Sequence, residues 1–415
     1  MKETKDVFKK IFPFLILGII IRLILMPVTL HPDLWAVSFS EYLFAYKGVI
    51  NIYDYLATLP QSSALVQNYG QNFFTYPPLS HFTFGIFGLI LKPLFNSSFF
   101  NSLDVNLPNV LNDSRVYLHL FLVKLPYLFF DIGVLILLSG LFDEPKKKQK
   151  AVVLWLFMPL AFYTSFMVGQ FDIIPVFFTI LSLCLAKKNK WEWAAISLGI
   201  GGAYKMFPLF FLPFLAIYGG KKASETIKLF IFGLLPYFLT IFPFLGSPFF
   251  RQNVLFSTQS QKMLFARLSV SGAEYLSVFI MFYIFFLGIA VYKRMELWKF
   301  FTLIMLLFFS VTHYHPQWFL WLAPFLVIFW VEYPKSKIFP AILLTCWFLI
   351  TILFEPSLSI SLFAPLEKNL QNVVSLSQTV NKYYDVFLFK SLVRSVFAGV
   401  SLTMAVLLFK KDESR

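Results

Sequence analysis

Charged side chains are scarce in this sequence. They make up 13% of its 415 residues, and only 21 residues are acidic. Soluble domains carry about 25% charged residues, so this composition excludes a soluble enzyme, a coiled coil and a disordered chain. Cysteine is rare as well. The two present, Cys184 and Cys346, both fall inside apolar runs, which argues against a disulfide framework.

Hydrophobic residues, by contrast, make up 58% of the chain, and the mean hydropathy is +0.73. Apolar runs of roughly 17–25 residues recur from end to end, which is the length that a helix needs to cross a bilayer. The sequence therefore predicts an all-α, multi-pass integral membrane protein. The run that follows Lys9 and Lys10 continues to about Leu30, and we expect it to be the first membrane helix rather than a cleaved signal.

Basic residues exceed acidic ones by 14. In a soluble protein this excess would suggest nucleic acid, but in a membrane protein it can simply mark the cytoplasmic side. The basic blocks share one side if residues 79–95 lie in the membrane interface instead of crossing. We adopt that interpretation, and expect cytoplasmic termini, no nucleic-acid partner and, in a prokaryote, a plasma-membrane location. The blocks are residues 146–150, 187–190, 221–228, 293–299, 335–337 and 410–415.

On this map the chain is a single domain, 1–415, of about twelve transmembrane helices without internal repeats. Three segments on the outer side are long, namely 31–115, 247–273 and 355–385, and the first is expected to contain juxtamembrane helices. The expected spans are residues 11–30, 116–141, 151–169, 172–186, 191–204, 207–220, 227–246, 274–292, 300–312, 316–332, 338–354 and 386–409.

Polar residues that could do chemistry gather at the outer ends of these helices. Asp33 follows the first helix directly, after a proline that restricts the backbone. Each residue also has a plainer explanation, such as an exposed interfacial Asp33, a helix cap at Asp172 or a solvated Lys205. A metal site at the two histidines would need further ligands. The candidates are Asp33, the weaker Asp54, Tyr76, Gln170, Asp172, Lys205, Arg267, His313 and His315.

Three ionisable residues, Arg22, Lys124 and Asp131, fall inside predicted spans. Charges within a membrane are costly, and they are usually paired or functional. Lys124 and Asp131 are seven residues apart and share a helix face. The simplest interpretation is a structural ion pair, formed by these two or with Arg22.

The order of the outer motifs resembles the C-type (GT-C) glycosyltransferase superfamily. The likeness is closest to the dolichyl-phosphate-glucose glucosyltransferases and to the GPI-pathway and bacterial mannosyltransferase-like proteins. It covers about residues 30–320, and the order and spacing of the motifs support it more than any one of them. The histidine-rich turn and a shorter C-terminal part differ from the eukaryotic glucosyltransferases, so the sugar stays open. The matching motifs are Asp33, Tyr76-Pro77-Pro78-Leu79, Gly169-Gln170-Phe171-Asp172, Tyr204-Lys205 with Pro208, and His313 to Gln317.

The resemblance implies an enzyme that moves a hexose, mannose or glucose, from a polyprenyl-phosphate donor to a lipid-linked glycan or other acceptor. Asp33 would be the base, with inversion at the anomeric carbon. Lys205, Arg267 and His315 would contact the donor phosphate, and His313, Asp172, Gln170 and Tyr76 are further substrate-binding candidates. No cofactor is expected, although a divalent cation is left open. The sequence shows no nucleotide-binding loop or Asp-x-Asp motif, which fits a lipid-phosphate donor. The alternative is a multi-spanning transporter or lipid flippase, which the intramembrane charges favour.

Overall fold

The computed structural model describes residues 2–100 and 107–410. Two parts of the predicted map lie outside the described residues: 101–106 in the first outer segment, and 411–415 in the last basic block. Within the described residues the fold is all-α apart from one small antiparallel hairpin, in which Leu268 of β1 (Arg267–Ser269) pairs with Leu276 of β2 (Tyr275–Ser277).

The α-helices are α1 (Lys2–Val28), α2 (Asp33–Lys47), α3 (Ile52–Thr58), α4 (Ala64–Tyr69), α5 (Pro78–Leu91), α7 (Arg115–Gly140), α8 (Pro145–Leu156), α9 (Pro159–Ala161), α10 (Ile173–Lys187), α11 (Trp191–Tyr204), α12 (Leu212–Gly219), α13 (Ala223–Ile241), α14 (Pro248–Phe250), α15 (Thr258–Gln261), α16 (Val278–Tyr292), α17 (Leu297–Val311), α18 (Ala323–Glu332), α19 (Ile338–Ile352), α20 (Leu376–Val380) and α21 (Val386–Lys410). The short 3₁₀ and π segments are η1 (Leu107–Asn112), η2 (Phe162–Val168), η3 (Phe207–Phe211), η4 (Phe242–Phe244), η5 (Arg251–Leu255), η6 (Lys262–Leu264), η7 (Pro316–Trp321), η8 (Pro334–Ser336), η9 (Pro356–Leu358), η10 (Ile360–Phe363) and η11 (Lys368–Asn372).

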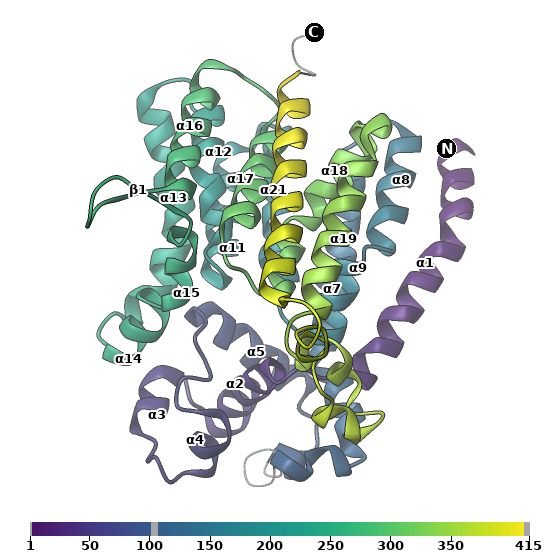
Figure 1. Cartoon of the computed structure of the whole chain (residues 1–415), viewed down its shortest axis with the longest axis vertical. Coiled ribbons are helices and arrows are strands. Elements are labelled where there is room, and N and C mark those ends of the chain that lie inside the picture. The colour runs from purple at the N-terminus through teal and green to yellow at the C-terminus, as the bar shows by residue number, and fades with distance from the viewer. Residues whose placement is uncertain (1, 101–106, 411–415) are drawn as a thin grey trace.

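The helices form an upright bundle with both chain ends at the same end of it (Figure 1). Helices α2 to α5 gather at the opposite end, where the short helices that precede α21 also lie. Within the bundle, α7 packs against α1, α8 and α10, α11 packs between α10 and α13, and α21 packs against α17 and α19. The fold therefore separates an end that carries both termini from an end built of short helices and loops.

The predicted count of twelve membrane spans is wrong. Helices form close to the predicted positions, but in the described residues only five are long and apolar enough to cross a membrane. They become six if α8 and the following segment, which are bent by 41°, count as one broken span. The five are Ile11–Val28, Arg115–Gly140, Ala223–Phe244, Pro334–Ile352 and Val386–Lys410.

The other apolar helices are too short. A helix of 15 residues, such as α10 or α17, rises only about 22 Å, whereas the hydrocarbon core of a bilayer is about 30 Å thick. Much of their apolar surface serves the protein interior instead. Most of α17 and α18 is buried inside the bundle, as expected for helices that are hydrophobic on all sides. An apolar run thus indicates that a helix is shielded from water, but it does not show whether lipid or protein surrounds that helix.

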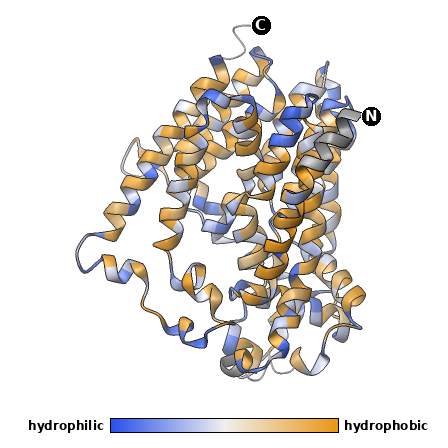
Figure 2. Cartoon of the chain, turned by 90° about the vertical axis from the view of Figure 1, so that its right-hand side faces the viewer, coloured by the Kyte–Doolittle hydropathy of each residue, from blue (hydrophilic) through white to orange (hydrophobic). Residues whose placement is uncertain are grey.

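The long helices expose their apolar residues to the outside. Ile24 on α1, Leu239 on α13 and Leu402 on α21 are each more than half exposed. Figure 2 shows hydrophobic residues along most of the bundle. An exposed apolar surface of this extent is typical of a face that contacts lipid. The structure therefore supports a multi-pass integral membrane protein.

Candidate functional site

Asp33 is the first residue of α2, directly after Pro32, at the end of the bundle opposite the termini. Its side chain is 39% exposed. One carboxylate oxygen, Oδ2, accepts a hydrogen bond from the Gln170 side-chain amide at 2.7 Å. The other, Oδ1, lies 3.6 Å from His31 Nδ1. The helix N-terminus also favours a negative charge at this position. The Asp33 carboxylate is thus oriented by hydrogen bonding and remains accessible to solvent.

Gln170 is positioned by a sharp turn at the end of η2. The turn depends on Gly169, which has a φ of +80° and whose missing Cβ would come within 2.7 Å of Leu34 Cδ1. Besides Asp33, the buried Gln170 amide donates to the Tyr76 hydroxyl at 3.2 Å. One amide therefore ties together two residues that are 43 positions apart in the sequence.

Tyr76 precedes the Pro77-Pro78 pair at which α5 begins. Burial of its hydroxyl, reinforced by the nearby Asp33 charge, raises the pKa of Tyr76, so this group stays a neutral phenol. Its ring packs edge-on against Phe171, with centroids 4.8 Å apart. Tyr76 can therefore offer a hydroxyl for hydrogen bonding but does not compete with Asp33 as a base.

Asp172 and Lys205 form a buried ion pair directly behind this group. The Lys205 ammonium lies 2.6 Å from Asp172 Oδ2, and the Trp321 indole donates to the other oxygen. The Asp172 side chain is fully buried. Asp172 stands at the N-cap position of α10, as a helix cap would, but its side chain makes no capping hydrogen bond. Lys205 also lies over the Phe171 ring, 4.7 Å from its centroid. Because Asp172 compensates its charge, Lys205 is not an unpaired cation.

A second cluster, here called the cationic cluster, consists of Lys262, His313, His315, Lys390 and Arg394. Lys262 Nζ donates to His315 Nε2 at 3.1 Å. Both histidine rings and the Lys390 ammonium lie within 6.4 Å of the centroid of one ring, Phe354. Arg394 lies over the Tyr314 ring and donates to the Thr312 carbonyl. The cluster therefore brings together the 262–264 segment, the histidine-rich turn and α21.

The two histidines are the uncharged members of this cluster at neutral pH, because burial and the neighbouring cations lower their pKa. Burial, with the Lys262 charge adding to it, lowers the pKa of His315 to about 4. Burial and then the charges of Lys262, Arg394 and Lys390 lower the pKa of His313. Asp33 acts in the opposite direction on His315, which indicates that the cluster and the carboxylate are neighbours. An anion at this point would relieve the repulsion.

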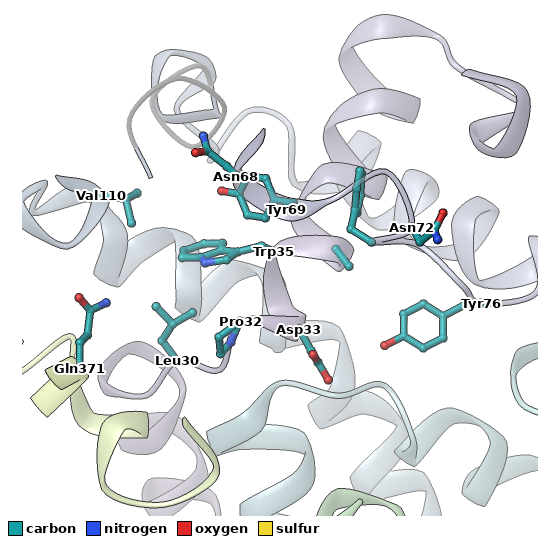
Figure 3. Close-up of a pocket in the computed structure, with 12 residues that line it drawn as sticks. Leu30, Pro32, Asp33, Trp35, Asn68, Tyr69, Asn72, Tyr76, Val110 and Gln371 are labelled. Atoms are coloured by element: carbon teal, nitrogen blue, oxygen red, sulfur yellow. The ribbon is translucent and has the colours of Figure 1, made fainter. Parts of the chain in front are cut away.

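Two cavities flank the site and share Tyr76. The first, of about 580 Å³, opens in front of Asp33 (Figure 3). In that view the Tyr76 hydroxyl points towards Asp33 from across the cavity. The second, of about 200 Å³, is mostly apolar and is lined by Lys205 and by aromatic residues that include Phe207, Trp318 and Trp321. The carboxylate therefore faces a polar space, and an apolar space begins on the other side of Tyr76.

Not every predicted residue reaches this site. Arg267 lies on the exposed hairpin, where its guanidinium sits over Tyr275 of the paired strand, 4.9 Å from the centroid. Asp54 lies on the exposed surface of α3 and accepts from the Asn51 side chain at 2.7 Å. Neither lines the two cavities. Among the described residues, no group of three or more His, Cys, Asp or Glu could hold a metal ion.

The intramembrane charges have structural partners. Arg22 pairs with Asp131 at 2.6 Å, and the Trp155 indole donates to the same carboxylate. Lys124 instead donates to the backbone carbonyls of Met26 and Thr29 at the end of α1. The expected ion pair therefore exists, with Arg22 and not Lys124 as its cation.

Sequence reasoning missed Lys390 and Arg394. They are four residues apart at the start of α21, so they share a helix face, and they lie against the charge pattern that places basic residues on the cytoplasmic side. Two basic residues with that spacing, at the outer end of an apolar helix, could have identified them as site candidates from the sequence. Trp321, which binds Asp172, had no signal beyond its place in an apolar run.

No protein-family model matches this chain, and no curated protein sequence matches it either. The likeness to C-type glycosyltransferases therefore remains a prediction from the sequence motifs.

Proposed function

We propose that this chain is a membrane glycosyltransferase that moves a hexose, mannose or glucose, from a polyprenyl-phosphate donor to a lipid-linked glycan or other acceptor. The reaction takes place at the end of the bundle opposite the termini, on the extracytoplasmic side. The observation that carries the proposal is the accessible Asp33 carboxylate, which has a polar cavity in front of it, with an apolar cavity and the cationic cluster close by.

Asp33 is the general base. The acceptor hydroxyl attacks the anomeric carbon of the donor, its proton passes to Asp33, and the carbon–phosphate-oxygen bond breaks with its electron pair leaving on the phosphate. One base and one direct displacement invert the anomeric configuration. Gln170 holds Oδ2 by its hydrogen bond and thereby orients the carboxylate. A positioned base of this kind contributes about 10²–10⁴-fold to the rate.

The cationic cluster stabilises the leaving phosphate. Positive groups aimed at developing negative charge are the main source of stabilisation in such reactions. His315 of the predicted set belongs to this cluster, together with Lys262, Lys390 and Arg394. Lys205 has a different role in the proposal, because Asp172 already compensates its charge: it holds Phe171 and Tyr76 in place.

The apolar cavity takes the first isoprene units of the donor. Met206, Phe210 and Phe308 line it, and Phe207 stacks on Trp321 with centroids 4.4 Å apart. Burying apolar chain against these rings is favourable by about 25 cal/mol for each Å² removed from contact with water. The rest of the polyprenyl chain lies in the surrounding lipid.

The test is Asp33→Asn, with Asp54→Asn as its matched control on the exposed α3 helix. Purified protein in lipid nanodiscs is offered radiolabelled mannosyl and glucosyl polyprenyl phosphates with extracted lipid-linked glycans. We expect Asp33→Asn to lower transfer by at least 100-fold at an unchanged thermal midpoint, and Asp54→Asn to transfer normally. Full transfer by a folded Asp33→Asn protein would rule out Asp33 as the base.

A transporter or flippase drew its support from the intramembrane charges. All three now have protein partners, and they lie within the packing of α1, α7 and η2. Movement of sugar or lipid across a proteoliposome membrane without any product would favour that alternative over the transferase.

A further inference from the structure

The cavity in front of Asp33 has walls from four separate parts of the chain. The start of α2 contributes Asp33 and Trp35, and the end of α4 with the loop after it contributes Asn68, Tyr69 and Asn72. Val110 of η1 and Gln371 of η11 close the opposite side (Figure 3). Its volume of about 580 Å³ lies within the range of small-molecule sites, which is about 300–1,000 Å³.

The walls combine carboxamides with aromatic rings. Asn68, Asn72 and Gln371 each present an amide that can both donate and accept hydrogen bonds. Tyr69 is half-buried and presents a flat apolar surface that carries a polar group. Trp35 also lines the cavity, but only 4% of its surface is exposed. A sugar ring offers the complementary surfaces, since its C–H groups form an apolar face and its hydroxyls surround the edge. A sugar ring can therefore make both kinds of contact in this cavity.

The charge of the walls argues against anionic ligands. Of the described residues that line this cavity, Asp33 is the only one with a charge. A phosphate or carboxylate ligand would meet that negative group without a lining cation, and desolvating a charge without a partner is costly. Lys205 lines the other cavity, and the cationic cluster does not line this one. The cationic side chains that could bind a phosphate therefore lie outside the cavity that the three amides line.

The rings are held in place before any ligand arrives. Trp35 is 4% exposed and packs near the His119 ring. Tyr69 packs edge-on against Phe39, with centroids 4.8 Å apart, and Phe39 is itself buried. A site whose rings are already ordered loses little conformational entropy on binding. This arrangement favours a binding surface over an incidental gap between helices.

From this combination we infer that the cavity is the acceptor site and that it binds an uncharged saccharide, with a sugar ring against Tyr69 and its hydroxyls on Asn72 and Gln371. The assignment of this cavity as the acceptor site rests on the proposed function. Binding of the saccharide itself requires no donor and can be measured separately. This assignment narrows the acceptor to a neutral sugar unit, and argues against a lipid phosphate as the group next to Asp33.

The experiment measures binding of free saccharides to the full-length protein in nanodiscs, without donor, by saturation-transfer NMR and calorimetry. The probes are neutral di- and trisaccharides of mannose, glucose and N-acetylglucosamine, and a glucuronic-acid disaccharide of equal size. We expect at least one neutral probe to bind, and the anionic probe to bind at least tenfold more weakly.

Variants then locate the site. Tyr69→Leu and Asn72→Ala should each weaken binding at least tenfold, whereas Tyr69→Phe keeps a ring and should retain most of the binding. Trp193→Leu and Gln252→Ala, at exposed positions outside the cavity, should leave binding unchanged. If Tyr69→Leu fails to fold, Asn72→Ala and Gln371→Ala show whether the saccharide binds in this cavity.

Two results would overturn the inference: no neutral probe binds, or binding is the same in the folded cavity variants as in the unmodified protein. Either result, alongside donor-dependent transfer that needs Asp33, would leave the transferase standing with another acceptor. Conversely, the protein could bind a saccharide in a way that depends on Asn72 and yet consume no polyprenyl-phosphate sugar. That result would contradict the proposed function but not the saccharide site.

Discussion

At the residue scale, the buried charges of this protein divide into structural and reactive groups according to their partners. Arg22 and Asp131 satisfy each other, and Arg22 also donates to the Gly18 and Leu156 carbonyls. Asp33 differs, because its side chain remains partly exposed beside a cavity. Partnership within the protein indicates a structural role, and access to a cavity indicates chemistry.

Removing one member of the buried pair should be worse than removing both. Arg22→Leu leaves Asp131 uncompensated in the interior, and we expect it to cost about 3–5 kcal/mol of stability. The double variant Arg22→Leu/Asp131→Leu should recover most of that loss, since it leaves no buried charge. Thermal unfolding in detergent measures both. A double variant as unstable as Arg22→Leu alone would contradict a stabilising role for the pair.

His81 should make stability depend on pH. Its Nε2 donates to the Val49 carbonyl and its Nδ1 lies 2.8 Å from the Ser40 hydroxyl, and burial lowers the pKa of His81 from 6.5 to about 4. Below pH 6.5 the unfolded chain takes up a proton that the folded protein resists. The stabilisation is therefore complete above pH 6.5 and is lost as the pH falls towards 4, by up to roughly 3 kcal/mol.

Thermal midpoints between pH 7.5 and 4.5 would check this. His81→Gln cannot take up the proton, so its midpoint should fall less over that range than the midpoint of the unmodified protein. Because His315 also has a lowered pKa, the difference between the two proteins is the informative quantity. Identical pH slopes would show that His81 is not the group involved.

At the element scale, the turn between η2 and α10 holds the site together. Gly169 ends η2 in the left-handed region, and the next residues place Gln170 on Asp33 and Asp172 on Lys205. The chain needs glycine there for two reasons, the positive φ and the approach of Leu34. A small change at this turn should therefore affect catalysis more than it affects folding.

Gly169→Ala should lower stability by about 1–3 kcal/mol through backbone strain, and should reduce transfer by about 100-fold through displacement of Gln170. Gly48→Ala is the matched control, because Gly48 also has a positive φ, of +66°, but has no atom within 4 Å of its missing Cβ. We expect it to cost some stability and little transfer. Equal transfer losses in the two variants would assign the effect to strain alone.

Close packing between helices shows why an apolar pattern overestimates the number of membrane spans. The sequence places α10 and α11 well, but α11 packs so closely on α13 that a Cβ at Gly199 would lie 2.0 Å from the Gly233 carbonyl oxygen. Small residues at such crossings are typical of tight packing between membrane helices. Because protein and lipid are both apolar surroundings, composition does not distinguish a helix that faces lipid from one enclosed by other helices.

At the scale of the whole molecule, the side of the membrane on which each end of the bundle lies is a prediction from the charge pattern. Both termini lie at one end of the bundle, and the helices of the first long segment lie at the other (Figure 1). Lys147 lies in the first turn of α8, and Lys187 pairs with Asp143 just before that helix, at the end of the bundle that carries the termini (Figure 1). From the positive-inside rule we predict that this end lies in the cytoplasm.

Single cysteines would test this orientation. In a background without the two native thiols, Cys184 and Cys346, an impermeant reagent applied to sealed cells should label Ser62→Cys and Ser271→Cys. It should label Ser224→Cys, at the other end, only after lysis. Labelling of Ser224→Cys in sealed cells, with Ser62→Cys protected, would reverse the map.

The sequence by itself determined that this protein is helical and belongs in a membrane. These two properties depend on composition and on the length of apolar runs, which can be read locally along the chain. The sequence also placed Gln170, Asp172 and Lys205 in turns. Only the tertiary structure decided which of these side chains meet. Gln170 reaches Asp33 across 137 positions, and Asp172 cancels the Lys205 charge. It also decided that Lys390 and Arg394 join the histidines and Arg267 does not. Such contacts depend on how helices cross, and the crossing is set by packing among many residues at once.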